Sequence, residues 1–313
     1  MAEKNIDFDV GIIGGGPAGM SAALWCADLG MKAVLLEKEA DLGGQLLWTF
    51  NAITNYLGVE AANGHELRDR FLQHIIERNV ELLTSASVSS ADLRARSVAL
   101  EDGRQLTARA IIIATGVRRR RLDVPGEDEF RGRGILDSGV RSQNDVAGKT
   151  VVIVGGGDAA LENALMLSET AKSVTLVHRR DEFTARPDFV DSARQDPKIE
   201  FVLDSHVAAI TGNQNVEGVE IRGVRSGATS RLAADAVLIR IGVVPNTQLF
   251  HGQLDLDPGG YIVTTTNCAT SLPDVYAAGD VANPRSPTIS TAVGTAAAAG
   301  KNAFSSFRAG KEI

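Results

Sequence analysis

Spaced glycines followed by a carboxylate predict a dinucleotide site near the N-terminus. Gly14-x-Gly16-x-x-Gly19 follows an apolar run, and Glu37 ends the next apolar run, 18 residues after Gly19. Glycines in this pattern allow a tight turn, let the backbone approach a diphosphate, and let helix and strand pack closely. A carboxylate at this distance accepts hydrogen bonds from a ribose hydroxyl. The pattern favours a dinucleotide without a 2′-phosphate over a merely structural glycine turn.

The pattern recurs in the second half of the chain with a basic ending. Residues 155–160 read GGGDAA after the apolar run 151–154, and His178 occupies the position that Glu37 has in the first copy. Arg179 and Arg180 follow at once. Guanidinium groups bind a 2′-phosphate through charge-assisted hydrogen bonds, whereas an acid repels it. The second copy therefore predicts an NADP(H) site, with a solvated basic strand end as the alternative.

Both motifs require a strand, a tight turn, a helix and a second strand to position them. In each half, short strands with turns follow, and a run closes in glycine at Gly116 and Gly242. Each half is therefore predicted to be a nucleotide-binding unit with an added β meander. Residues 117–127 and 243–247 are the predicted crossings between domains, because Pro, Gly and charged residues replace apolar periodicity there.

Composition indicates an enzyme without a membrane span or a nucleic-acid partner. The 313 residues are 44% hydrophobic and 23% charged, with a net charge of −7 that disfavours phosphate-backbone binding. The N-terminal residues show no signal-peptide pattern, and no long apolar run suggests a membrane span. With two cysteines no disulfide framework is expected, so we expect a cytoplasmic location. The five histidines show no metal-ligand spacing, so we expect no metal site.

The chain resembles the low-molecular-weight thioredoxin reductase family of flavoproteins over almost its whole length. The resemblance is carried by the stretches GIIGGGPAGMSAA, LGGQL, IIIATG, VPGE, VVIVGGGDAALENAL, HRRDEF, IGVVPNT and DVYAAGD. It implies an α/β fold with two Rossmann-like, three-layer dinucleotide-binding domains. The NADPH domain, residues 118–243, would be inserted in a discontinuous FAD domain, residues 1–117 and 244–313.

The resemblance also implies which residues hold each cofactor. For FAD, the expected residues are Gly14, Gly16, Pro17, Ala18, Gly19, Glu37, Lys38, Gly43, Gly44, Gln45, Asn55, Val88, Thr115, Gly116, Gly279, Asp280, Thr288 and Ile289. For NADPH, they are Gly155, Gly157, Asp158, Ala159, Ala160, His178, Arg179, Arg180 and Arg186. No catalytic side chain is assigned, because hydride transfer to a flavin requires no side-chain acid or base.

Three departures from the family pattern matter for function. No Cys-x-x-Cys pair precedes the second glycine-rich turn, so the chain lacks the two thiols that the family's dithiol relay requires. Cys26 in the first helix and Cys268 in a strand-like run are interpreted as buried structural thiols. Thr184 stands where the basic NADP motif has a later arginine, with Arg186 two residues on, and Pro287-Thr288 replaces an Arg-Gln pair that faces the flavin.

Ferredoxin (or flavodoxin) NADP reductases of the thioredoxin-reductase-like type resemble the chain most, since they lack the disulfide. Their C-terminal aromatic extension is not expected here, because the sequence ends at Ile313, soon after a predicted helix from Ile289 to Ala303. The resemblance implies a homodimer in which electrons pass from NADPH through FAD to ferredoxin or flavodoxin.

Alternatives stay open for both the activity and the partner. One is an NADPH oxidase, diaphorase or small-molecule reductase, and another is a non-catalytic flavin-binding sensor or assembly partner. Arg118 to Arg121, with Arg131 and Arg133, are either a docking patch for an acidic carrier protein or an arginine-rich linker.

Overall fold

The computed structural model describes residues 6–78 and 80–309. The sequence-based expectations for residues 1–5 and for the end of the chain at Ile313 concern residues outside this described part. The chain divides into two units, which are described separately: a first unit of Met1–Arg118 and Val244–Ile313, and a second unit of Arg119–Val243.

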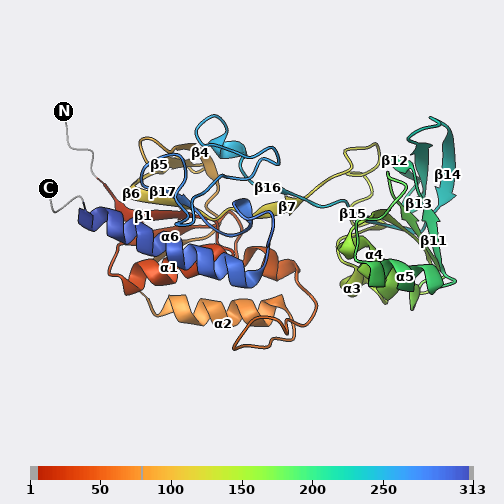
Figure 1. The fold of residues 1–313 in the computed structure, drawn as a ribbon, viewed down its shortest axis with the longest axis horizontal. Helices are drawn as coiled ribbons and strands as arrows, with labels where there is room; N and C mark the ends of the chain where they lie inside the picture. The colour runs from red at the N-terminus through yellow and green to blue at the C-terminus, as the bar shows by residue number, and fades with distance from the viewer. Residues whose placement is uncertain (1–5, 79, 310–313) are drawn as a thin grey trace. The chain divides into compact units, whose positions relative to one another are not determined.

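The first unit contains a mainly parallel sheet with an antiparallel extension and three long helices (Figure 1). Its strands are β1 (Phe8–Ile13), β2 (Ala33–Leu36), β3 (Val80–Leu83), β4 (Val88–Asp92), β5 (Ser97–Leu100), β6 (Gln105–Ile113) and β17 (Val275–Ala277). Its helices are α1 (Pro17–Asp28), α2 (Gly64–Ile76) and α6 (Ile289–Ala309), with 3-10 turns η1 (Gly44–Trp48), η2 (Gln248–Phe250) and η3 (Gly279–Val281). The crossings between the units contain β7 (Val117–Arg119) and β16 (Val243–Pro245), which pair with each other.

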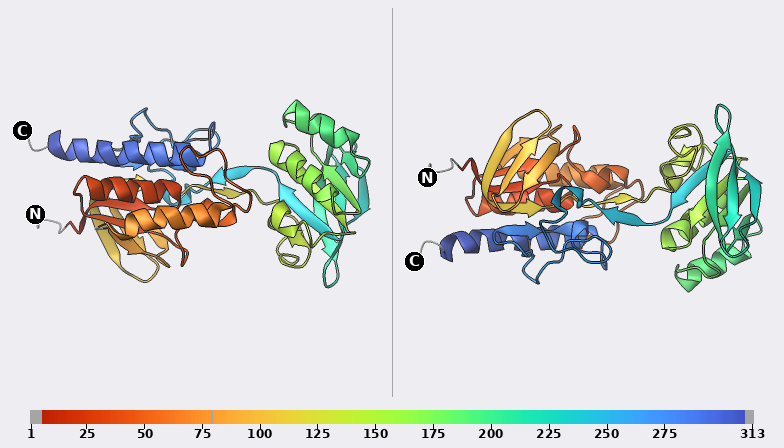
Figure 2. Two further views of the ribbon diagram at one scale, coloured as in Figure 1. Left: turned by 90° about the horizontal axis from the view of Figure 1, so that it is seen from below. Right: turned by 90° about the horizontal axis from the view of Figure 1, so that it is seen from above.

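Alternating side chains of the first sheet build two separate cores. Ala33 and Leu35 of β2 join the core under α1, α2 and α6, whereas Val34 and Leu36 join the core on the meander side. This period of two is the natural consequence of strand geometry. Figure 2 shows α1 and α6 side by side on one face of the sheet, with the β4–β5 meander on the other. Strand β6 belongs to both layers, because its start pairs antiparallel with β5 and its end parallel with β1 and β17.

The second unit repeats this plan. Its strands are β8 (Ile135–Leu136), β9 (Thr150–Gly155), β10 (Ser173–Val177), β11 (Ile199–Val202), β12 (Ser205–Gly212), β13 (Val216–Gly223), β14 (Thr229–Ala233) and β15 (Ala236–Arg240). Its helices are α3 (Gly139–Ser142), α4 (Asp158–Ser168) and α5 (Pro187–Gln195). A parallel sheet of order β11-β10-β9-β15-β8 has helices on one face, and the antiparallel β12–β14 sheet packs on the other.

The expected fold class, two Rossmann-like three-layer units, is confirmed, and two local expectations need correction. Cys268 lies in a turn with φ 61° and not in a strand, because the Thr-rich run around it forms only isolated bridges. The small-residue helix continues past the expected Ala303 to Ala309. Among the described residues, no helix combines the length and apolarity that a membrane crossing requires.

Candidate functional site

The first glycine-rich turn leaves the start of α1 open to an anion. Gly16 is the N-cap without a side-chain hydrogen bond, Pro17 occupies the first turn, and no acidic residue lies there. The first N–H groups of a helix have no intrahelical partner, so they are available to a diphosphate. The other two glycines of the motif are also required by the local geometry. A Cβ at Gly19 would lie 1.8 Å from the carbonyl oxygen of Gly14, and Gly14 itself has a φ of 109°.

The Glu37 carboxylate is tied to this turn by the chain itself. It is buried, with 6% exposure, and its Oε2 accepts from the Gly15 N–H at 2.7 Å while Oε1 accepts from the Glu39 N–H at 2.9 Å. A carboxylate has about four lone-pair positions, so it retains acceptors for a ribose hydroxyl. Gly15 was not among the predicted residues, although a Cβ there would lie 2.9 Å from Glu37 Oε2.

A loop and a 3-10 turn enclose the same cradle. The Gly43 N–H donates to the Gly15 carbonyl at 2.8 Å, and a Cβ at Gly44 would lie 2.9 Å from the Cα of Gly16. Gln45 Nε2 donates to the Val117 carbonyl at 2.9 Å, just beyond Thr115 and Gly116. The predicted residues of this loop and of the end of β6 are therefore brought together around the turn.

The C-terminal segment reaches the cradle through η3. A Cβ at Gly279 would lie 2.8 Å from the Cβ of Ala18, so η3 packs directly on α1. Burial raises the pKa of the neighbouring Asp280 carboxyl. Thr115 Oγ1 donates to the Asn246 carbonyl at 2.8 Å, and Asn246 Nδ2 donates to the Thr115 carbonyl at 2.8 Å. Asn246 was missed by sequence reasoning, because only the fold brings it to Thr115.

The remaining predicted FAD residues lie on other segments of the first unit, and the structure gives them local contacts. Lys38 is exposed and pairs with Glu39 at 3.3 Å, Val88 pairs with Leu100 across the meander, and Asn55 lies in an exposed loop between η1 and α2. At the start of α6, the Thr288 hydroxyl accepts from the Thr291 N–H at 3.1 Å and precedes Ile289.

The second glycine-rich turn has the same open helix start with one difference. Gly157 is the N-cap of α4 without a side-chain hydrogen bond, but Asp158 brings a carboxylate into the first turn. Arg186 neutralises it, since its backbone N–H donates to Asp158 Oδ1 at 2.7 Å and its Nε lies 3.1 Å from Oδ2. Arg186 also lies over the Phe189 ring. A phosphate therefore competes with Asp158 for Arg186, and the role predicted for Arg186 stays a prediction.

His178 lies directly against the second turn. A Cβ at Gly156 would lie 2.4 Å from its ring, which also stacks on Phe183 at a centroid distance of 5.6 Å. Its Nε2 is buried without a hydrogen-bond partner. Burial lowers the pKa of His178, and the charges of Arg180 and Arg179 lower it further against the opposing effect of a backbone contact with Glu182.

Arg179 and Arg180 follow β10 at the carboxyl edge of the sheet. Both are exposed, and neither forms an ion pair within the described part of the chain. Thr184 closes the loop that carries them, because its N–H and its hydroxyl donate to the Gly156 carbonyl at 2.8 and 3.2 Å. Free guanidinium groups beside an open helix N-terminus suit a phosphate on the adenosine ribose.

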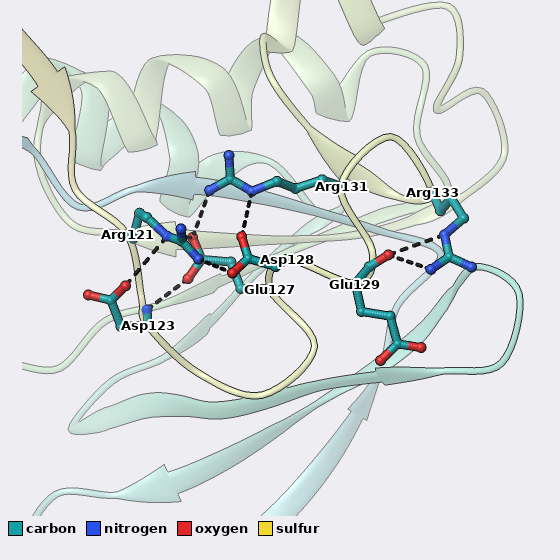
Figure 3. A network of polar contacts seen from close by, with 7 residues as sticks. All are labelled: Arg121, Asp123, Glu127, Asp128, Glu129, Arg131 and Arg133. Carbon is teal, nitrogen blue, oxygen red and sulfur yellow. Dashed lines mark hydrogen bonds and ion pairs between the residues drawn. The ribbon is translucent and has the colours of Figure 1, made fainter. Parts of the chain in front are cut away.

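The arginines of the predicted docking patch are held by contacts within the chain, and two of them pair with acids. Figure 3 shows Arg121 and Arg131 among acidic side chains. Arg121 lies 2.7 Å from Asp128 and 3.5 Å from Glu127, a carboxylate with only 3% exposure, and Arg131 lies 3.3 Å from Asp128. Arg133 donates to the Glu129 carbonyl. Acids neutralise Arg121 and Arg131, whereas neutral oxygens of the chain accept from the other arginines of the predicted patch, Arg118, Arg119, Arg120 and Arg133. These internal contacts favour the alternative of an arginine-rich linker.

The two cysteines are free and buried, as predicted. Burial, with a smaller effect of Asp9, raises the pKa of Cys26 to about 12, and burial raises the pKa of Cys268. The Cys268 thiol donates to the Thr295 carbonyl at 3.3 Å. Because the thiolate is the reactive form, neither residue suits thiol–disulfide exchange. Within residues 6–78 and 80–309, no cluster of three or more metal-ligating side chains is present.

Comparisons with known proteins agree with this geometry. Residues 8–299 match the family model described as pyridine nucleotide-disulphide oxidoreductase. The chain is 38% identical over 296 residues to the thioredoxin reductase of Streptomyces coelicolor, covering 93% of this chain and 91% of the relative. It is 35% identical over 304 residues to that of Listeria monocytogenes, covering 97% and 95%. The solved thioredoxin reductase of Lactococcus lactis superimposes with a TM-score of 0.83 at 33% identity, covering 96% of this chain and 98% of that one.

Proposed function

The chain belongs to the pyridine nucleotide-disulphide oxidoreductase family, and on that premise we propose that it passes electrons from NADPH through FAD directly to ferredoxin or flavodoxin. The family comparisons show a flavin-dependent NAD(P)H oxidoreductase that uses FAD and NADPH. The acceptor, the assignment of each cofactor to a unit and the individual site residues are our proposal.

We assign FAD to the first unit and NADPH to the second. The open start of α1, the enclosing glycine loop and the Glu37 carboxylate suit an adenosine diphosphate without a 2′-phosphate. The open start of α4, together with Arg179 and Arg180, suits an adenosine diphosphate that carries a 2′-phosphate. When bound, FAD accepts a hydride from NADPH and releases the two electrons one at a time. The protein binds and orients both dinucleotides at helix N-termini, where the N–H groups stabilise the diphosphates.

The observation that carries the proposed acceptor is the state of the cysteines. Relatives named thioredoxin reductase point to thioredoxin as the alternative acceptor. Reduction of a protein disulfide through an internal dithiol needs one thiolate to attack and a partner thiol to resolve. The sequence has only Cys26 and Cys268, both buried with raised pKa values. A carrier that takes single electrons from the flavin needs no such pair.

A second candidate is an NADPH diaphorase or small-molecule reductase. The ion pairs of Arg121 and Arg131 favour it, because they reduce the basic surface available to an acidic carrier protein. We also propose a homodimer, which is the usual state in the family, and size-exclusion chromatography with light scattering tests it.

Anaerobic stopped-flow absorbance tests the proposed function. The FAD-loaded protein is mixed with NADPH, and the reduced enzyme is then mixed with ferredoxin, flavodoxin, thioredoxin or a quinone. We expect rapid bleaching of the flavin and rapid reoxidation by ferredoxin or flavodoxin. Reoxidation by the quinone alone would support the diaphorase, and reoxidation by thioredoxin would contradict direct transfer to a one-electron carrier.

A further inference from the structure

Two arginines lie close together at the carboxyl edge of the second unit's parallel sheet. Arg240 ends β15, and Arg119 ends β7. Strand β15 lies between β9 and β8, and its register places Arg240 opposite Gly155, the first glycine of the second turn. The backbones are in contact, since a Cβ at Gly155 would lie 2.2 Å from the Arg240 carbonyl oxygen. The backbone of Arg240 therefore lies directly beside the glycine-rich turn that leads into the open start of α4.

Both guanidinium groups converge on one backbone oxygen. Arg240 Nη2 donates to the Asp137 carbonyl at 3.2 Å, and Arg119 Nη1 donates to the same oxygen. Arg240 Nη1 donates to the Ile239 carbonyl at 2.9 Å. A guanidinium has five N–H donors, so several remain on each side chain. A shared neutral acceptor holds the two cations together without compensating their charge.

The electrostatics distinguish this pair from Arg121 and Arg131, which Figure 3 shows among acidic side chains. Within the described residues, neither Arg119 nor Arg240 has a carboxylate oxygen within ion-pair distance, whereas Arg121 and Arg131 do. Burial lowers the pKa of Arg240 to about 10, with a further contribution from the charge of Arg119 and an opposing one from Asp137. Burial also lowers the pKa of Arg119 against the attraction of Asp137. Both side chains remain charged at neutral pH, and an anion between them would relieve their repulsion.

The position selects the kind of anion. In open parallel sheets, ligands bind at the carboxyl ends of the strands where the strand order reverses. Here the order reverses between β9 and β15, which is the place of Gly155 and Arg240. Arg179 and Arg180 lie on the other side of β9, after β10. The two arginine pairs therefore flank the glycine-rich turn, one toward the adenosine ribose and one toward the remainder of the dinucleotide.

We propose that Arg119 and Arg240 form an anion site for the diphosphate of the pyridine nucleotide, an inference that rests on the proposed NADPH-binding role of the second unit. NADPH and NADH share the diphosphate and differ only in the 2′-phosphate. The Arg119–Arg240 pair therefore contributes equally to both coenzymes, whereas Arg179 and Arg180 contribute to NADPH alone.

Anaerobic isothermal titration of the FAD-loaded protein, with its flavin reduced beforehand by dithionite, with NADPH, NADH and 2′-AMP tests the proposal. Loss of one charge-assisted contact in Arg240→Gln is expected to weaken NADPH and NADH by the same factor, about tenfold, and to leave 2′-AMP unchanged. Arg119→Gln follows the same pattern with a smaller factor. The matched control Arg179→Gln weakens NADPH and 2′-AMP and leaves NADH unchanged. Arg240→Lys, which keeps the charge, recovers part of the loss, and circular dichroism verifies the fold of each variant.

Two outcomes would overturn the proposal: unchanged coenzyme affinities in Arg240→Gln, or a loss confined to NADPH. These titrations measure binding without turnover, so they are independent of which acceptor reoxidises the flavin. Failure of the proposed acceptor leaves the coenzyme affinities as they are.

Discussion

The two glycine-rich units place different side chains in the same position. In the first, buried Glu37 accepts the Gly15 N–H, so the strand end and the turn are joined by a hydrogen bond of 2.7 Å. In the second, the His178 ring packs against Gly156 and leaves Nε2 buried without a partner. A Cβ at either middle glycine would collide with the strand-end side chain, and at Gly15 it would also collide with Leu42. One architecture thus has a buried carboxylate at the strand end in one unit, and a buried imidazole followed by two exposed arginines in the other.

The largest expected effect concerns the last glycine of the first turn. Gly19→Ala places a Cβ on the Gly14 carbonyl at 1.8 Å, so the turn must move and FAD binding is lost, with destabilisation of about 1–3 kcal/mol or more. The second unit already has Ala160 here, and Ala160→Gly is expected to cost only about 1 kcal/mol. Flavin absorbance and thermal denaturation measure both. Full FAD occupancy in Gly19→Ala would show that the two turns differ less than the geometry indicates.

The basic ending of the second unit predicts a selective loss. Replacing Arg179 and Arg180 together by Gln removes two charge-assisted donors, so the Michaelis constant for NADPH should rise by about 100-fold. The constant for NADH, which has no 2′-phosphate, should stay within about twofold. Steady-state reduction of a dye acceptor measures both. An equal rise for the two coenzymes would assign these arginines to another part of the nucleotide.

Replacing His178 at the end of β10 by the residue type of its counterpart Glu37 tests whether this position sets the coenzyme preference. His178→Glu puts a carboxylate where Glu37 lies in the first unit, next to the place predicted for the 2′-phosphate. Repulsion should raise the Michaelis constant for NADPH by about tenfold and leave NADH unchanged or improved. His178→Gln, which adds no charge, serves as the control. Equal effects of Glu and Gln would show that packing against Gly156, and not charge, is what matters.

The lowered pKa of His178 predicts a small pH effect on stability. The unfolded chain protonates this residue near pH 6.5, whereas the folded chain keeps it neutral to lower pH. The unfolded state therefore binds more protons between the two pKa values, and stability falls as the pH drops through that window. His178→Gln should lose less stability than the wild type between pH 8 and pH 5 in thermal denaturation. Equal losses of stability in the variant and the wild type would show that protonation of His178 does not contribute to the pH dependence of folding.

The smallest expected effect comes from the cysteines. Cys26→Ala and Cys268→Ala, alone or together, should leave the rates of flavin reduction and of carrier reduction within about twofold, because buried protonated thiols take no part in electron transfer. Stopped-flow absorbance measures these rates, and thermal denaturation measures any packing loss. A large drop in the rate of carrier reduction, in a variant that is still folded, would show that a thiol takes part in electron transfer.

Local motifs predicted the glycine turns, the Glu37 and His178 positions and the duplicated plan, because each depends on spacing within about 30 residues. Contacts between distant segments could not be predicted: Asn246 reaches Thr115, and strand register places Arg240 opposite Gly155. The charge of residues 118–121 was a clear signal. The pairing of Arg121 with Glu127 and Asp128 depends on how the loop folds, although these acids stand only a few residues away.

Anaerobic reductive titration tests the central claim, that the flavin delivers electrons without a protein dithiol. The FAD-loaded protein is titrated with dithionite while flavin absorbance is followed and free thiols are counted before and after. A flavin alone takes up about two electrons per chain, and a flavin with a redox-active disulfide takes up about four. We predict about two electrons and an unchanged thiol count. Uptake of about four electrons with two new thiols would contradict the account.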